Sequence, residues 1–424
     1  MKNEQLPSAL PYTEAELSAM NRFVPYNPQQ ALEYASALRS EGFAPEAVSN
    51  ILTQARLRTA AVQKFGSNAH RMLFTEAGYE QSTRSAVAKF HTQRFVEAGI
   101  SSVADLGCGI GADSLGFAQA ELSVVGIEID PTVAALARFN LADFAHARVL
   151  CTDLKNLDVA YLNDDAGKPV GALWLDPARR TVDAGRTSSR TFDPEMFSPP
   201  LSFVKELATT GIPMGVKMGP GIPHEEIPDN CEAQWISHGG QVVEVVLWFN
   251  KLARAGVRRS AVVLDANPLE PAVLAECCSP VSEAEATPAV VGELGKYLYE
   301  PDGAIVRAHL VGELAQELNA QLLDEHIAYL TANHLSQSPA AQGFEVLSTM
   351  PINEKVLKRW VREENIGTLT IKKRGVDIVP ESLRKKLLGQ SKKKKGSESA
   401  SLILTRLGEG AASQRIAIHT RPIS

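Results

Sequence analysis

The sequence has few of the residues that build disulfide frameworks and zinc sites. It contains five cysteines in 424 residues, and no two of them form a C-x-x-C pair. We therefore expect neither a disulfide scaffold nor a metal site. The N-terminal segment has no apolar core of the kind found in signal peptides, and no hydrophobic run reaches the length of a membrane span. These absences favour a cytoplasmic protein without a membrane partner.

Negative charge predominates overall, with a net charge of −6, but positive charge is concentrated near the C-terminus. Residues 355–395 contain 10 Lys and 4 Arg against 3 Glu and 1 Asp, a net charge of +10, which leaves −16 for the rest of the chain. A basic module on an acidic protein favours a polyanionic partner, and nucleic acid is the simplest candidate. The lysine run at 392–395 is weaker evidence, because solvated loops also carry such runs.

Residues 103–113 have the pattern of a buried strand, a glycine-rich turn and a helix. Gly107, Gly109 and Gly111 permit backbone conformations and a close approach of a ligand that a Cβ atom would block. Asp105 stands just before the first glycine. The same turn also fits the G-x-G-x-x-G/A fingerprint of dinucleotide-binding proteins, so the turn alone indicates a nucleotide cofactor without deciding which one.

An acidic residue follows or ends each of the first four predicted strands of this region. These residues are Asp105, Glu128, Asp153 and Asp176. Because the carboxyl ends of parallel strands meet at one edge of a sheet, we expect the four side chains to lie along that edge. This layout, over residues 100–220, resembles that of class I S-adenosylmethionine-dependent methyltransferases.

The resemblance implies a role for each of these residues. Asp105 and the three glycines match the motif that holds the methionine part of the cofactor. Glu128 matches the acid that binds the ribose, and Asp153 matches the residue that accepts a hydrogen bond from the adenine amino group. Asp176 and Pro177 match the catalytic motif beside the methyl group. The resemblance therefore implies an enzyme that uses S-adenosyl-L-methionine.

The catalytic motif departs from that of methyltransferases that act on base amines. Those enzymes usually carry Asn/Asp-Pro-Pro followed by an aromatic residue that stacks on the base, whereas Ala178 and Arg179 follow Asp176-Pro177 here. Asp176 can still accept a hydrogen bond from an amine, so N-methylation is the favoured chemistry. Phe192, Trp174 or an arginine would have to supply the stacking partner. No cysteine follows this strand, so methylation at carbon-5 of a pyrimidine has no obvious nucleophile.

Two segments that flank the motifs supply further candidates. Helical periodicity over residues 12–95 predicts an N-terminal helical domain. At its end, Gln81 and Thr83 could contact the methionine end of the cofactor, or could cap the helix that begins at Ser85.

Four arginines follow the catalytic motif: Arg179, Arg180, Arg186 and Arg190. Their guanidinium groups would suit phosphates that flank a target base. Ion pairs with nearby aspartates are the alternative.

The C-terminal residues alternate between strand and helix patterns and predict a small α+β module. A strand at 368–372 runs into a basic segment, and a helix that starts with Pro380 follows it. This order resembles the THUMP-like domain of bacterial methyltransferases, which implies RNA as the partner. The RNA-binding candidates in this module are Lys372, Lys373, Arg374, Lys385 and Lys386.

The sequence therefore predicts an α/β protein of four parts. These are an N-terminal helical domain (1–95), a Rossmann-like seven-stranded methyltransferase core (96–265), a linker and helical connection (266–335) and a basic THUMP-like domain (336–424). The predicted function is methyl transfer from S-adenosylmethionine to a base nitrogen of rRNA or tRNA. The alternatives are a methyltransferase of a small molecule or protein, and a non-catalytic RNA-binding protein that retains the cofactor fold. The four acids argue against the latter, because a dead site has no reason to keep them.

Overall fold

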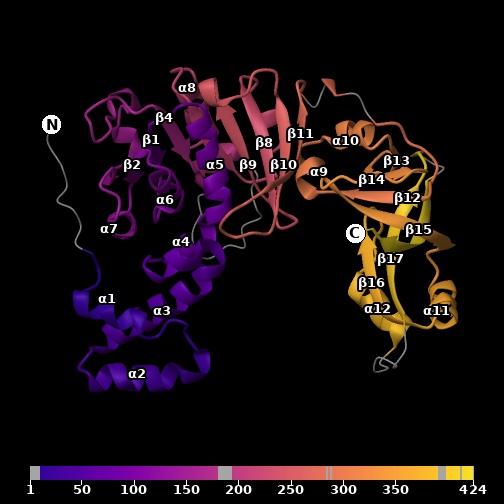
Figure 1. The fold of residues 1–424 in the computed structure, drawn as a ribbon, viewed down its shortest axis with the longest axis horizontal. Helices are drawn as coiled ribbons and strands as arrows, with labels where there is room; N and C mark the ends of the chain where they lie inside the picture. The colour runs from indigo at the N-terminus through magenta and orange to yellow at the C-terminus, as the bar shows by residue number, and fades with distance from the viewer. Residues whose placement is uncertain are drawn as a thin grey trace. The chain divides into compact units, whose positions relative to one another are not determined.

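The computed structural model describes residues 10–179, 193–282, 285–286, 289–389, 398–410 and 413–423. The chain forms two compact units (Figure 1). The first comprises residues 1–233, 244–255 and 265–272, and the second comprises residues 234–243, 256–264 and 273–424. The division into four parts remains a prediction.

The first unit begins with a layer of helices (Figure 1). They are α1 (Glu14–Asn21), α2 (Ala31–Ser40), α3 (Pro45–Phe65), α4 (Glu76–Gln81) and α5 (Ser85–Glu97). Thr13 and Glu16 form a capping box that starts α1, and Pro45 at the first position starts α3. Met20, Leu38 and Ile51 bring the first three helices into one apolar cluster.

A nine-stranded sheet has the order β11-β10-β8-β9-β7-β4-β1-β2-β3. Its strands are β1 (Ser102–Leu106), β2 (Ser123–Glu128), β3 (Ala147–Cys151), β4 (Ala172–Leu175), β7 (Met214–Met218), β8 (Cys231–His238), β9 (Gln241–Phe249), β10 (Arg259–Leu264) and β11 (Val273–Ser279). Strands β3, β2, β1, β4 and β7 are parallel, and β9 is antiparallel to β7. The α/β fold is therefore confirmed, but the sheet has two strands more than the seven that were predicted.

Three helices connect the parallel strands: α6 (Ala112–Gln119), α7 (Pro131–Asn140) and α8 (Leu201–Ala208). All residues of β1 and β4 are buried, which explains why these strands read as continuous apolar runs without alternation. Phe95 of α5 and Phe117 of α6 pack against Trp174 of β4. The short strands β5 (Ala178–Arg179) and β6 (Phe197–Ser198) pair with each other, and β5 directly follows Asp176-Pro177.

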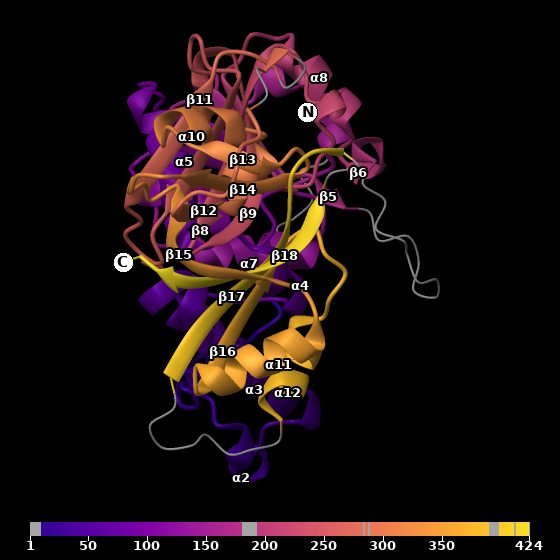
Figure 2. The ribbon, with the colours of Figure 1, turned by 90° about the vertical axis from the view of Figure 1, so that its right-hand side faces the viewer.

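The C-terminal unit contains a seven-stranded sheet of order β13-β14-β12-β15-β18-β17-β16 (Figure 2). Its strands are β12 (Tyr297–Pro301), β13 (Gln321–Asp324), β14 (Ile327–Ala332), β15 (Ala341–Pro351), β16 (Ile366–Lys373), β17 (Glu398–Leu407) and β18 (Gln414–Pro422). Its helices are α9 (Gly303–Arg307), α10 (Val311–Glu317), α11 (Glu354–Glu363) and α12 (Pro380–Leu388). Helices α11 and α12 contribute Leu357, Trp360 and Leu387 to its core.

The segment 266–335, predicted as a linker and helical connection, contains helices α9 and α10 and also the strands β11, β12, β13 and β14. Strand β11 lies on the edge of the nine-stranded sheet, and most of its side chains are exposed or half-buried. Strands β12, β13 and β14 are only four to six residues long. An exposed edge strand has no apolar alternation, and short strands give too few residues to define a period. Both reasons explain why the sequence pattern did not indicate these strands.

Candidate active site

The carboxyl ends of the first four strands lie at the same edge of the sheet. Leu106 at the end of β1 is in register with Ile127 of β2 and with Leu175 of β4. Glu128 is in register with Cys151 at the end of β3. Each predicted acid therefore stands at or just beyond a strand end at this edge, as the strand pattern predicted.

The glycine turn forms an open backbone cradle at this edge. Gly107, Gly109 and Gly111 have φ angles of 97°, 55° and 85°, which non-glycine residues rarely adopt. The backbone N–H groups of Gly107 and Cys108 both donate to the carbonyl of Ile127 at 2.9 Å, which fixes the turn to β2. A Cβ atom built on Gly107 or Gly109 would meet no atom within 4 Å. The turn therefore leaves room for a ligand directly against its backbone.

The carboxylates of Glu128 and Asp153 accept backbone hydrogen bonds, but these bonds use only some of their acceptor positions. Glu128 Oε2 accepts from the N–H of Gly109 at 3.0 Å, and its Oε1 accepts from the N–H of Asp130 at 2.9 Å. Asp153 Oδ1 accepts from the N–H of Lys155 at 3.0 Å. Each carboxylate oxygen can accept a second hydrogen bond, so both side chains can still bind hydroxyl or amino groups.

Asp176, the predicted catalytic residue, forms an ion pair with Lys217. Lys217 of β7 donates from Nζ to Asp176 Oδ2 at 2.5 Å and to Thr83 Oγ1 at 2.8 Å. The Lys217 side chain is 13 % exposed and that of Asp176 is 36 % exposed. The strand pattern placed Lys217 near this edge, and the contact confirms that position.

The hydrogen-bonded chain continues from Thr83 into the interior. Thr83 Oγ1 donates to Asp113 Oδ2 at 2.7 Å, and Asp113 Oδ1 lies 3.4 Å from Nδ1 of His91. His91 is fully buried, and its Nε2 bonds to Glu244 of β9. Sequence reasoning identified Thr83 but missed the other three side chains. Asp113 stood within the motif segment, whereas His91 and Glu244 had no local signal.

The raised pKa values of His91 and Lys217 indicate that this series of hydrogen-bonded side chains contains charged groups. Burial would lower the pKa of His91, but Glu244 and Asp113 outweigh it and raise the pKa to about 9. Burial likewise opposes the Lys217 ammonium, yet the carboxylates of Asp176 and Asp113 hold its pKa above the ordinary value. His91 and Lys217 are therefore both cationic at neutral pH and balance the buried carboxylates.

Asp105 behaves differently, because no cation among the described residues contacts it directly. Burial and the negative charge of Asp113 raise its pKa to about 8, although Ser114 Oγ donates to its Oδ2 at 2.5 Å. Desolvation, opposed by Lys217, also raises the pKa of Asp176. The edge of the sheet therefore holds more acidic groups than cations, an environment that favours a positively charged ligand.

Comparison with known proteins identifies the family. The chain is 32% identical over 375 residues to an uncharacterized S-adenosylmethionine-dependent methyltransferase from two strains of Mycobacterium tuberculosis, and the alignment covers 86% of this chain and 95% of the relative. The protein is an S-adenosylmethionine-dependent methyltransferase. Residues 341–422 of the methyltransferase match the family described as THUMP domain-like. The predicted enzyme class, cofactor and C-terminal module are thereby confirmed.

A crystal structure of a protein from Porphyromonas gingivalis W83, which is described as a methyltransferase by inference, has the same fold. It superposes with a TM-score of 0.72 at 19% sequence identity, and the match covers 98% of this chain and 100% of that chain. The likeness extends over both units of the methyltransferase.

The residues at the sheet edge fit S-adenosylmethionine, which supplies a methyl group on a positively charged sulfur. The open backbone at Gly107 and Gly109 can lie against the methionine part, and Glu128 can accept hydrogen bonds from ribose hydroxyls. Asp105 and Asp153 complete the predicted cofactor set. These individual roles remain predictions that rest on the resemblance and on the geometry of this edge.

The segment before α5 covers the glycine turn. A Cβ atom on Gly78 of α4 would lie 2.7 Å from Ile110 Cγ2, so α4 packs directly on the turn. Lys64 Nζ donates to the carbonyls of Tyr79 and Glu80 at 2.6 and 2.9 Å and fixes the end of α4. Gln81 is exposed, in contrast to Thr83. Of the two predicted ligands in this segment, only Thr83 joins the buried chain.

The predicted RNA-binding residues lie in different environments. Lys372 pairs with Glu300 and also donates to Gln342 Oε1 at 2.8 Å. Arg374 Nη1 donates to the carbonyl of Ala328 at 2.8 Å. Both cations therefore have partners inside the C-terminal unit.

Three other candidates of that unit are exposed: Lys373, Lys385 and Lys386. Arg179 is the last residue of β5. The remaining candidates Arg180, Arg186, Arg190 and Phe192 lie outside the described residues.

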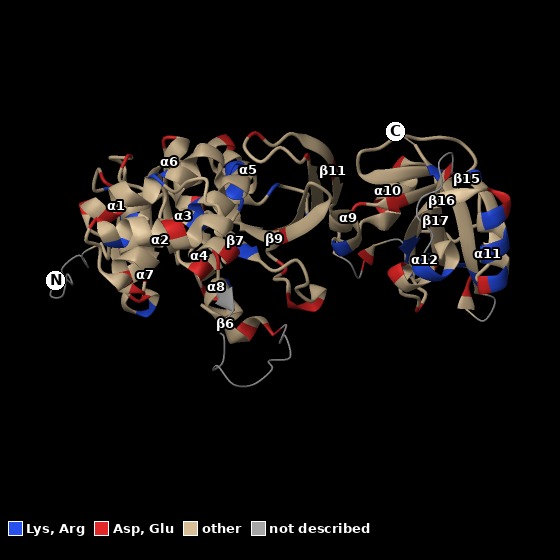
Figure 3. Ribbon diagram, turned by 90° about the horizontal axis from the view of Figure 1, so that it is seen from below, with Lys and Arg blue, Asp and Glu red and all other residues tan. Residues whose placement is uncertain are grey.

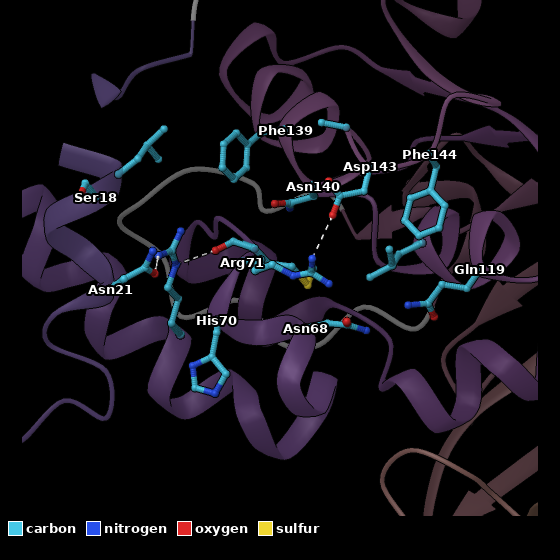
Figure 4. A pocket seen from close by; sticks show the side chains of 15 residues that line it. Ser18, Asn21, Asn68, His70, Arg71, Gln119, Phe139, Asn140, Asp143 and Phe144 are labelled. Carbon is cyan, nitrogen blue, oxygen red and sulfur yellow. Dashed lines mark hydrogen bonds and ion pairs between the residues drawn. The ribbon is translucent and has the colours of Figure 1, made fainter. Parts of the chain in front are cut away.

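A cavity of about 420 Å³ lies between the N-terminal helices and helices α6 and α7 (Figure 4). Its lining includes Arg58, His70 and Asn140, and an exposed ion pair joins Arg71 to Asp143 at 3.3 Å. None of the four predicted acids lines it. The cavity is therefore distinct from the sheet edge that carries the four predicted acids.

Two further features concern only the part of the chain that the structure describes. Within it, no cluster of three or more His, Cys, Asp or Glu side chains has an arrangement suited to a metal ion. No helix in the same residues combines the length and the apolar character needed to cross a membrane.

Proposed function

We propose that the methyltransferase transfers the methyl group to a base nitrogen of RNA, with rRNA or tRNA as the substrate. The observation that carries this proposal is the combination of the THUMP domain-like match over residues 341–422 with an exposed basic surface on the same module. Modules that resemble this one deliver structured RNA to a methyltransferase. The buried-acid edge of the other unit supplies the cofactor chemistry.

The basic surface lies on α11 and α12, and we call it the α11–α12 face (Figure 3). Its exposed or half-exposed cations are Lys355, Lys358, Arg359, Arg362, Arg384, Lys385 and Lys386. The apolar sides of both helices pack on the sheet through Leu357, Trp360 and Leu387, which leaves the cations on the outside. Such cations can contact phosphates in any sequence context.

Asp176 supports the choice of a nitrogen as the methyl acceptor. Lys217 occupies its Oδ2, whereas its Oδ1 has no hydrogen-bond partner among the described residues. The side chain is partly exposed, so Oδ1 can accept a hydrogen bond from an N–H group of a base. An acceptor at this position orients the nitrogen toward the methyl group.

The test of the catalytic part is transfer of labelled methyl from S-adenosylmethionine to RNA isolated from a strain that lacks the gene, followed by identification of the nucleoside. We expect wild-type protein to label one nucleoside. Asp176→Ala should lose most of the turnover and keep its cofactor affinity, because its effect lies in positioning at the transition state. Full activity of this variant would contradict the assignment of Asp176.

The test of the RNA part is the salt dependence of binding. The double variant Lys385→Glu with Lys386→Glu should weaken RNA binding and reduce the slope of log affinity against log salt by about 2. The matched control is Lys168→Glu with Lys205→Glu, which reverses the charge of two exposed lysines in the other unit. If wild-type protein has no RNA affinity at low salt, a small-molecule or protein substrate replaces RNA.

A further inference from the structure

The ion pair between Asp176 and Lys217 places an acceptor and a donor side by side at the catalytic position. Asp176 Oδ1 is available as an acceptor, as described above. The Lys217 ammonium has three N–H donors. Two of them bond to Asp176 and Thr83, and in the described part of the chain the third has no partner. A substrate at this position therefore meets a carboxylate and an ammonium together.

This pair matches a ring nitrogen that carries a hydrogen and stands next to a carbonyl group. The N–H of such a lactam can donate to Asp176, and the adjacent carbonyl oxygen can accept from Lys217. When the nitrogen loses its proton, the negative charge spreads onto that oxygen. A fixed cation at this oxygen stabilises the negative charge as it develops, and such preorganised stabilisation is usually a large part of catalysis.

An exocyclic amine would gain no such benefit from Lys217. The amine of adenine or cytosine also stands next to a ring acceptor, so the same two contacts can form. A cation that donates to the ring nitrogen, however, withdraws electron density from the amine and makes it a poorer nucleophile. The lysine therefore distinguishes the two kinds of nitrogen by chemistry and not by shape.

We propose that the methyl acceptor is a lactam ring nitrogen of an RNA base, that is N1 of guanine or N3 of uracil, with Asp176 as its proton acceptor and Lys217 bound to the adjacent oxygen. This inference rests on the proposed RNA function and specifies its substrate. The ring N–H gives its proton to the Asp176 carboxylate, and the nitrogen forms a bond to the methyl carbon. The carbon–sulfur bond breaks, and its electron pair returns to sulfur.

The surroundings of the pair keep Lys217 charged throughout this step. The groups that act on it are Asp176, Asp113 and Glu244, and they outweigh the loss of solvation. Lys64 is the nearby cation whose charge opposes them. Because Lys217 stays protonated, Asp176 is the only member of the pair that can take the proton.

The first test identifies the methylated nucleoside in RNA from a strain that lacks the gene. The proposal predicts 1-methylguanosine or 3-methyluridine. A label on an exocyclic amine, on a carbon or on a ribose oxygen would overturn the lactam assignment and leave RNA methylation intact. Absence of label in any RNA, by contrast, would refute the proposed function itself, so the two failures are distinguishable.

The second test uses variants of Lys217. Lys217→Met should lower kcat by about 100-fold, the effect of losing one preorganised electrostatic contact, and should shift the rising limb of the pH–rate profile to higher pH. Lys217→Arg retains the positive charge. Its kcat should be higher than that of Lys217→Met, and its pH–rate profile should match that of the wild-type protein. The matched control is Lys205→Met on the exposed face of α8. An unchanged pH profile in Lys217→Met, with folding verified by thermal melting, would overturn the role of this lysine.

A binding measurement gives a readout that is independent of turnover. By saturation-transfer NMR, the cofactor-free full chain should bind guanosine or uridine monophosphate in preference to the N1- or N3-methylated form of the same nucleotide. Adenosine and cytidine monophosphates, which can form the same two contacts, should also bind and serve as positive controls. Asp176→Ala, which removes the acceptor of the ring N–H, should lose the preference, and equal binding of the unmethylated and methylated nucleotides by the wild-type protein would contradict the proposal.

Discussion

The imidazole of His91 packs against the indole of Trp174, with ring centroids 4.6 Å apart and ring planes tilted by 37°. His91 belongs to α5 and Trp174 to β4, two residues before Asp176. Because His91 is cationic and its ring lies within 6 Å of the Trp174 ring centroid, this contact is favourable beyond the area that it buries. The contact links the buried charged side chains of the methyltransferase to the strand that precedes Asp176.

His91 should make the stability of the methyltransferase depend on pH. Its pKa is raised from 6.5 to about 9 in the folded state, so its stabilising contribution is complete below pH 6.5 and is lost as the pH rises through 9. Urea unfolding should show that His91→Gln lowers the free energy of unfolding more at pH 6 than at pH 10, by a difference on the order of 3 kcal/mol. The exposed His326 is the control, and equal losses at both pH values would refute a charged His91.

The glycine turn should tolerate no side chain at the cofactor position. Gly107→Ala combines a positive φ of 97° with a Cβ atom in the space where the methionine part is predicted. Gly211 has a φ of 79° and equally open surroundings, so Gly211→Ala introduces similar strain away from the site. Both variants should lose about 1 kcal/mol of stability. Calorimetry should show loss of S-adenosylmethionine binding only for Gly107→Ala.

Glu128 should contribute directly to cofactor affinity. Glu128→Ala removes the acceptor predicted for the ribose hydroxyls and should weaken binding of S-adenosylmethionine by about 1–3 kcal/mol. The variant also removes the acceptor of the Gly109 N–H, so Glu128→Gln, which keeps one acceptor oxygen, separates the two effects. Calorimetry with unchanged affinity in both variants would reject the ribose assignment.

Lys372 should act on the stability of the C-terminal unit and not on RNA binding. Lys372→Met leaves Glu300, whose side chain is 19 % exposed, with Arg374 at 3.9 Å as its one ionic partner among the residues that the structure describes. We expect a loss of about 1 kcal/mol in thermal unfolding, because the pair is partly exposed to solvent. RNA affinity should stay within about twofold. A large loss of RNA affinity in a normally folded Lys372 variant would show that the RNA surface extends beyond the α11–α12 face.

The sequence was sufficient to predict the motif edge, because periodicity located the strands and parallel strands must end together. It predicted the positions of Asp105 and Asp176 at the edge for that reason. It could not predict that Lys372 and Arg374 are occupied inside their own module, because a sequence shows the charge of a side chain but not its partner. The basic segment was correctly located, and the residues that remain exposed within it were visible only in the structure.

The His91 network was the main omission. A histidine in an amphipathic helix has no sequence feature that distinguishes a packed residue from a charged one. Its partner Glu244 belongs to a strand of the same sheet far along the chain, and only the pairing of β9 with β7 brings the two together. Contacts of this kind arise from the topology of the sheet and have no counterpart in local spacing.

Glu244 lies 153 residues after His91, and this separation determines when the two side chains can pair. A nascent chain that ends before β9 already contains the glycine turn and Asp176. It lacks Glu244, the carboxylate that compensates the buried imidazolium of His91. The buried imidazolium of His91 therefore gains its Glu244 partner only after β9 has been translated, and translation products that end before β9 should be less stable around α5.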